Sequence, residues 1–155
     1  MDDNPIGLTA TAGRREVLKR TEFFSSLTDE QYARLAEISQ PQLFRKSAPI
    51  YSKNDPPDAF FVLVEGVVRF SLHLGGASAS AGEIIRRGDV FGWAALVEGS
   101  KSRLATAHSL TDARVLSIDG ERLIELMEGD STMGYLLMKR LNALISGDLN
   151  HFVAG

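Results

Sequence analysis

The sequence contains no cysteine, which excludes disulfide bonds, a thiolate nucleophile and any metal centre held by cysteine. This absence also fits a reducing compartment, and we place the protein in the cytoplasm. Long hydrophobic runs are missing as well, since none approaches the roughly 18 residues that a membrane span needs. Residues 1–13 lack the basic start and apolar core of a signal peptide. We therefore expect a soluble protein with no role in a membrane.

Concentrated positive charge is also absent. The 17 Lys and Arg residues are outnumbered by 20 Asp and Glu residues, and basic residues gather only in pairs such as Arg14-Arg15. Because binding to phosphate backbones requires a concentrated basic face, we expect no nucleic-acid binding by this chain alone. The three histidines, at positions 73, 108 and 151, lack metal-ligand spacing, so we predict no metal site.

Known catalytic motifs are missing too. The sequence has no nucleophile elbow, HExxH motif, Walker loop or paired-carboxylate motif. We therefore predict that the protein is not an enzyme and requires no cofactor. Its 155 residues, 44% of them hydrophobic, match the size and composition of one globular domain.

The chain begins and ends with helical patterns. Residues 1–13 look like a flexible lead-in, and a domain is expected over 14–155. A helical pattern starts at Arg14. Thr28 with Gln31 forms a capping box that opens a second helix, which we expect to run through about Ile38 and to be stopped by Pro41. A short helix is predicted over 121–127 and a long one over 131–153.

The section from Pro41 to Asp119 has the shorter period of β-strands. Residues 59–64 form a continuous apolar run that suits a strand buried on both faces, and the following alternation predicts a hairpin that turns at Glu65-Gly66. Residues 75–82 are small and rich in glycine, which predicts a loop. Further short strands are expected over 83–86, 103–110 and 113–118.

One apolar stripe runs along the predicted long helix, at steps of three or four residues. It consists of Met133, Leu137, Leu141, Leu144 or Ile145, Leu149 and Phe152. A small β-roll cannot cover such a long stripe, and we expect the part from Leu141 onward to need a second copy. The sequence therefore predicts a parallel homodimer through this helix.

Residues 88–97 read GDVFGWAALV, and residues 102–107 read SRLATA. This pair of segments resembles the phosphate-binding cassette of cyclic-nucleotide-binding domains, as in the cAMP receptor protein and the regulatory subunits of protein kinase A. The resemblance implies an α+β fold with an antiparallel, jelly-roll-like β-roll of eight strands, N-terminal helices, a short cassette helix and a long C-terminal helix. It identifies the candidate ligand-binding residues as Phe91, Gly92, Trp93, Ala94, Ala95, Arg103 and Leu104.

The chemistry of these residues supports a phosphate clamp. Gly92, Ala94 and Ala95 are small enough for the backbone to approach an anion at the start of a short helix. The guanidinium of Arg103 is permanently charged and can donate two parallel hydrogen bonds to the same anion. A structural ion pair of Arg103 with Glu83, Asp89 or Glu98 is the alternative reading.

Three features depart from the family pattern. Trp93 stands where the family has the glutamate that binds the ribose, and it is either a stacking platform for a base or a lid that fills the site. Leu104 replaces a smaller residue and narrows the pocket. The long helix offers apolar residues around Leu144 and Ile145 to a purine, so base recognition is unassigned.

Two functions follow from the resemblance. The first is a regulatory module that binds cAMP, cGMP or a similar small phosphate and relays the event through its C-terminal helix. The second is a degenerate domain without a nucleotide ligand, which serves dimerisation or protein interaction. The sequence leaves no room for the helix-turn-helix domain that a transcription factor of this family would add, so we expect either that the domain stands alone or that an output domain lies outside this sequence.

Overall fold

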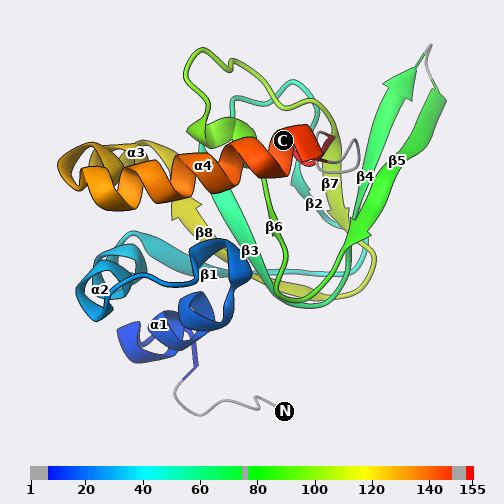
Figure 1. The fold of residues 1–155 in the computed structure, drawn as a ribbon. Coiled ribbons are helices and arrows are strands. Elements are labelled where there is room, and N and C mark those ends of the chain that lie inside the picture. Colours follow the sequence, from blue (N-terminus) through cyan, green and yellow to red (C-terminus); the bar gives the residue numbers. More distant parts are fainter. Residues whose placement is uncertain (1–6, 75–76, 148–152) are drawn as a thin grey trace.

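Two four-stranded antiparallel sheets form a β-roll in the computed structural model, which describes residues 7–74, 77–147 and 153–155 (Figure 1). One sheet has the strand order β1-β8-β3-β6 and the other has the order β2-β7-β4-β5. The strands are β1 (Ser39–Phe44), β2 (Pro49–Tyr51), β3 (Ala59–Glu65), β4 (Val68–Leu74), β5 (Ala77–Ile85), β6 (Val90–Phe91), β7 (Thr106–Ser109) and β8 (Ala113–Asp119). The expected antiparallel roll with helices at both ends of the chain is confirmed.

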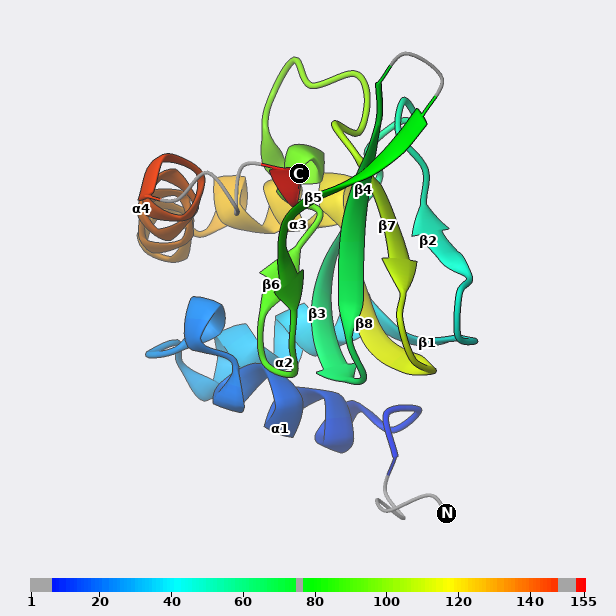
Figure 2. The same ribbon diagram turned by 90° about the vertical axis from the view of Figure 1, so that its right-hand side faces the viewer.

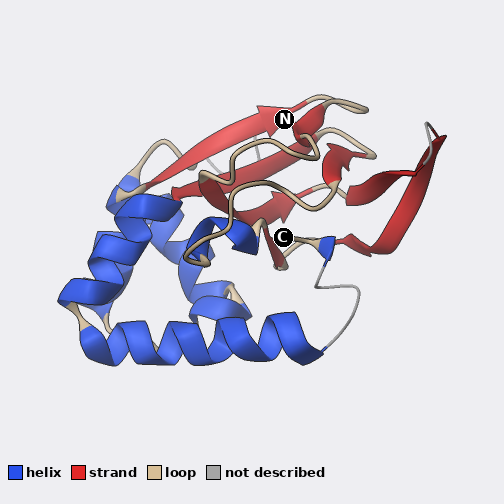
Figure 3. Cartoon of the chain, turned by 90° about the horizontal axis from the view of Figure 1, so that it is seen from above, coloured by secondary structure: helices blue, strands red, loops and turns tan. Residues whose placement is uncertain are grey.

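Helices precede, interrupt and follow the strands. They are α1 (Thr11–Arg20), the 3-10 helix η1 (Glu22–Phe24), α2 (Asp29–Glu37), the 3-10 helix η2 (Trp93–Leu96), α3 (Gly120–Gly129) and α4 (Ser131–Gly147). The α-helices gather on one side of the strands, where α4 lies along the outside (Figures 2 and 3). The first helix begins at Thr11, earlier than the sequence pattern predicts, and Leu8 before it is already buried. None of the described helices is long and apolar enough to cross a membrane.

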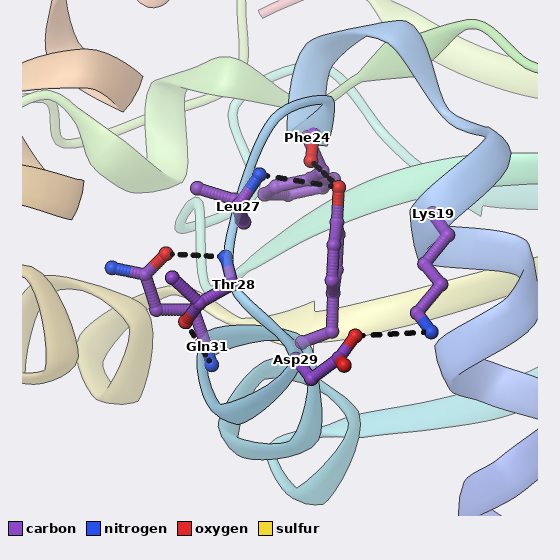
Figure 4. A network of polar contacts seen from close by, with 7 residues as sticks. Lys19, Phe24, Leu27, Thr28, Asp29 and Gln31 are labelled. Carbon is purple, nitrogen blue, oxygen red and sulfur yellow. Dashed lines mark hydrogen bonds and ion pairs between the residues drawn. The ribbon is translucent and has the colours of Figure 1, made fainter.

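The predicted capping box opens α2 (Figure 4). The Thr28 hydroxyl accepts a hydrogen bond from the Gln31 backbone N–H at 3.1 Å, and the Gln31 side chain accepts one from the Thr28 N–H at 2.8 Å. Both donors would otherwise be unpaired at the helix start. The Tyr32 hydroxyl then donates to the Phe24 carbonyl at 2.6 Å, which ties α2 to η1.

The expected end of this helix near Ile38, before Pro41, is confirmed, since the helix ends at Glu37 and Ile38 is its C-cap. Pro41 itself lies inside β1, where it faces Leu116 of β8. Strand β1 is at the edge of its sheet, and an edge strand tolerates a residue without a backbone N–H.

The two strands that flank Glu65-Gly66 do not form the predicted hairpin. The chain does turn there, but β3 and β4 belong to different sheets, so the turn carries the chain from one sheet to the other. The buried character of residues 60–63 in β3 is confirmed. An alternating pattern reports which face a strand buries and does not report its partner, which explains the error.

The prediction of a loop over 75–82 is wrong from Ala77 onward. This part of the chain starts β5, which pairs with β4 from Leu74↔Ala77 to Phe70↔Ala81. The ladder uses backbone groups, so a strand of small residues can pair with its neighbour as well as a strand of large ones. The strand predicted over 103–110 is shorter than expected, since β7 begins at Thr106 and leaves Arg103 in the loop before it.

The apolar stripe of α4 packs on the chain itself. Met133, Leu137 and Leu141 are all buried, so the expectation that the stripe is exposed from Leu141 onward is wrong at that residue. Leu149 and Phe152 lie outside the described residues.

Candidate functional site

Gly92 joins β6 to η2 and brings the backbone close to Arg103. Its φ of +82° lies in the left-handed region. A Cβ at this position would lie 2.9 Å from the Phe61 ring, 3.1 Å from the Ala59 carbonyl oxygen and 3.2 Å from Nη1 of Arg103. Both the backbone conformation and the close contacts therefore require glycine here.

The backbone of Arg103 is fixed by the turn between β2 and β3. The Arg103 N–H donates to the Asp55 carbonyl at 2.8 Å, and its own carbonyl accepts from the Asn54 N–H at 3.1 Å. The Asp55 carboxylate in turn accepts from the Ser52 N–H at 2.8 Å. These bonds aim the Arg103 side chain into the roll, toward Gly92.

The guanidinium of Arg103 is enclosed, with only 2% of the residue exposed. Nη1 donates to the Gly92 carbonyl at 2.9 Å, and Nη2 donates to the Ala59 carbonyl at 2.6 Å. The central carbon Cζ lies 4.1 Å from the centre of the Tyr51 ring, a stacked cation–π geometry. Arg103 thus joins β3, β2 and the start of η2.

No Asp or Glu side chain in the described part of the chain forms an ion pair with Arg103. No Asp or Glu carboxylate lies within 4.0 Å of its guanidinium, and Nε is buried without a hydrogen-bond partner. Burial lowers the pKa of Arg103, and the charges of Tyr51, Asp58 and Asp55 oppose this shift. The group stays protonated, because an arginine does not lose its proton in a protein.

The alternative reading of Arg103 as an ion-pair member finds no support at two of its three candidate partners. Asp89 uses its carboxylate to accept the Arg86 N–H at 3.0 Å, and the exposed Glu98 makes no ion pair with Arg103. The side chain of Glu83 lies outside the described residues.

The other candidate residues surround this centre. Phe91 is fully buried, and its ring stacks on Phe61 with centroids 5.1 Å apart. Ala94 is buried, while Ala95 is half-buried and turns its carbonyl toward Gly120 at the start of α3. Leu104 is half-buried against the core. These side chains are apolar and bring no charge to the surroundings of Arg103.

Residues 153–155 lie in the same site, which the sequence did not predict. The Ala154 carbonyl accepts a hydrogen bond from the Gly92 N–H at 2.6 Å and one from the Tyr51 hydroxyl at 3.3 Å. The Gly155 carbonyl accepts from Nη1 of Arg103 at 2.8 Å. Both ribbon views show this end of the described chain beside η2 and β6 (Figures 1 and 2).

Trp93 covers the segment from the other side. It is almost fully buried, and a Cβ on Gly155 would lie 2.7 Å from two carbons of the indole ring. Gly155 is therefore pressed against the ring.

Burial raises the pKa of the Tyr51 phenol, while the charge of Arg103 opposes that shift.

Sequence reasoning missed Tyr51, Ala59 and Gly155. Ala59 and Gly155 act through carbonyl groups, which every residue has, so no sequence signal distinguishes them. Tyr51 is an aromatic residue just before a turn, and the frequent stacking of arginine on aromatic rings is the one signal that could have found it.

Leu144, considered above as a purine contact, lies elsewhere. It lines a groove of about 590 Å³ together with Phe23, Val90 and Arg140, between α4, η1 and β6. Arg140 donates there to the Phe23 and Ser25 carbonyls at 2.8 and 2.6 Å. This groove does not include Arg103 or Gly92.

The sequence model of the cyclic nucleotide-binding domain family matches residues 41–130, which is more than half of the chain. The chain therefore belongs to this family. The matched span includes Gly92 and Arg103 and excludes α4 and residues 153–155.

Solved structures show the same fold. A candidate cyclic nucleotide-binding protein from Geobacter metallireducens is 28% identical with a TM-score of 0.76, over 86% of this chain and 96% of that one. The regulatory domain of Toxoplasma gondii protein kinase A, solved with cAMP, is 18% identical with a TM-score of 0.72, over 86% of this chain and 51% of that one. The regulatory subunit of a cAMP-independent protein kinase A from Trypanosoma brucei, as a triple mutant bound to cAMP, is 17% identical with a TM-score of 0.76, over 95% and 52%.

The structure predicts that alanine reduces the stability of the protein by different amounts at Gly88 and Gly92, although both glycines have a positive φ. Gly88 has φ +92° with no atom within 4 Å of an added Cβ, so Gly88→Ala should cost only the left-handed strain of about 1–2 kcal/mol. Gly92→Ala should cost more, because the new Cβ meets Phe61 and Arg103. Equilibrium denaturation of both variants measures the difference, and equal losses of stability would show that the contacts around Gly92 are not tight.

Proposed function

We propose that this chain is a regulatory module that binds cAMP, cGMP or a similar small phosphate at Arg103. One observation carries the proposal: a buried, permanent cation that has no Asp or Glu ion-pair partner among the described residues and keeps one N–H without a hydrogen-bond partner. A buried charge that is not fully compensated costs several kcal/mol, and an anion that enters this site would offset that cost. A phosphate is the anion that best matches the planar fork of a guanidinium.

The position of this cation in the family fold adds support. Arg103 faces Gly92 across the cassette that the family model matches, and two neighbours solved with cAMP share the fold. Gly92 also turns its N–H into the site, so an entering phosphate would find a second donor there.

Trp93 limits how tightly an ordinary cyclic nucleotide can bind. An indole offers no acceptor for a ribose hydroxyl, and the loss of one charge-assisted hydrogen bond costs about 1.5–3 kcal/mol. We therefore expect an affinity for cAMP roughly 10- to 100-fold lower than a glutamate at this position would give. The aromatic ring of Trp93 could stack on a base only after Gly155 has moved away from it.

Arg103→Gln and Arg140→Gln form a matched pair for calorimetric titration with cAMP and cGMP. Arg103→Gln removes the charge from the proposed site and should weaken binding by about 100-fold or more, because two charge-assisted hydrogen bonds to phosphate are lost. Arg140→Gln removes an arginine that serves the carbonyls of Phe23 and Ser25, and it should leave the affinity unchanged.

Each variant has to be folded for this comparison, which circular dichroism establishes. If both variants lose the same amount of affinity, the ligand does not bind at Arg103. Absence of heat with both nucleotides and with inorganic pyrophosphate would reject the proposed function and leave the second candidate.

The second candidate is homodimerisation through α4, and a surface observation favours it. Tyr135 is 72% exposed and Met138 is 38% exposed on this helix. If this face is the dimer interface, Tyr135→Glu should halve the mass that light scattering reports at micromolar concentration. Leu43→Glu changes an equally apolar exposed residue on β1 and should not alter the mass. A monomeric mass for the unaltered chain would contradict the dimer.

A further inference from the structure

The 153–155 segment occupies the position that an entering anion needs. Its two carbonyl oxygens meet the two kinds of donor that the site offers, the Gly92 N–H at 2.6 Å and Nη1 of Arg103 at 2.8 Å. Tyr51 supplies a third donor to the Ala154 carbonyl at 3.3 Å. An external phosphate and this segment would therefore use the same donors, and they cannot be present together.

The segment fits the site closely. Ala154 is 1% exposed, and Gly155 lies against the indole of Trp93 so tightly that a Cβ would have to displace ring atoms. A segment held only by chance contacts would not be expected to pair each of its last two carbonyls with a buried donor.

The fit nevertheless leaves one donor unused. The segment offers one main-chain oxygen to Arg103, and Nε of Arg103 stays without a partner. Arginine pairs with phosphate through two parallel hydrogen bonds, and a phosphate has enough oxygens to reach Nε as well. A phosphate can therefore make more hydrogen bonds to Arg103 than the segment does.

We propose that the 153–155 segment is an internal ligand, which closes the pocket until a phosphate-bearing ligand displaces it. This inference rests on the function proposed above. The segment then sets the affinity that a ligand needs, because the ligand must bind strongly enough to replace the hydrogen bonds that the segment makes to Gly92 and Arg103.

Trp93 provides the readout, because it is the only tryptophan in the sequence and lies directly against Gly155. The experiment compares the unaltered chain with Gly155→Ala, with a variant that lacks residues 153–155, and with Gly129→Ala as a control. Gly129 has no atom within 4 Å of an added Cβ, so the same substitution there leaves the site intact. Acrylamide quenching of Trp93 fluorescence is measured first without ligand, and cAMP and cGMP are then titrated by calorimetry.

We expect Trp93 to be shielded in the unaltered chain and in Gly129→Ala, and accessible to acrylamide in the other two variants. Those two variants should also bind cyclic nucleotide about tenfold more tightly, since the ligand no longer displaces two hydrogen bonds. At saturating ligand, the unaltered chain and the variant that lacks residues 153–155 should show the same Trp93 emission.

The outcomes separate this inference from the proposed function. Equal quenching in all four proteins would show that the segment does not cover Trp93 and would overturn the inference alone. Equal affinity in all four, with clear binding, would also overturn the inference while the proposed function stands. If Trp93 becomes accessible but no variant binds a nucleotide, the proposed function fails, and the segment is then a permanent part of the fold.

Discussion

The buried charge of Arg103 is the constraint on which this end of the roll depends. A guanidinium with almost no access to water must find acceptors in the protein, and it takes them from three separate places: β3, the start of η2 and residues 153–155. The Tyr51 ring covers one of its faces. Gly92 is glycine for the same reason, because a side chain there would press on Arg103. The strands position the backbone, and Arg103 determines which groups lie close together at this end of the roll.

This constraint also explains why the site can serve as a switch. Main-chain oxygens accept hydrogen bonds from both terminal nitrogens of Arg103 but leave Nε without a partner, so a phosphate can compete for the site. The two sequence-based readings of Trp93 describe successive states in this account. Trp93 is a cover while Gly155 lies against it, and its ring becomes free to stack on a base once the segment leaves. The domain family is shown by the sequence match, whereas the competition is our proposal.

Local features of the fold were predictable because their physics is local. The capping box at Thr28 depends on residues three apart, and the burial of β3 depends on its own apolar run. Pairing between strands is not local, and so the hairpin at Gly66 and the loop before Gly82 were predicted wrongly. In the site, Arg103 and Gly92 were identified through their resemblance to a known cassette. The contact of Gly155 with Arg103 joins positions far apart in the sequence through a backbone carbonyl, which leaves no pattern in the residue types.

Nitrogen-15 NMR of the arginine Nε–H groups tests most directly that Arg103 is an anion site. The Arg103→Gln variant assigns the resonance, and Arg140 serves as an internal reference in the same spectrum. We expect the Arg103 Nε–H proton signal, which has no acceptor in the described structure, to move downfield as cAMP or cGMP is added, while the Arg140 signal stays in place. An Arg103 signal that stays unchanged at ligand concentrations where calorimetry shows saturation would contradict the account.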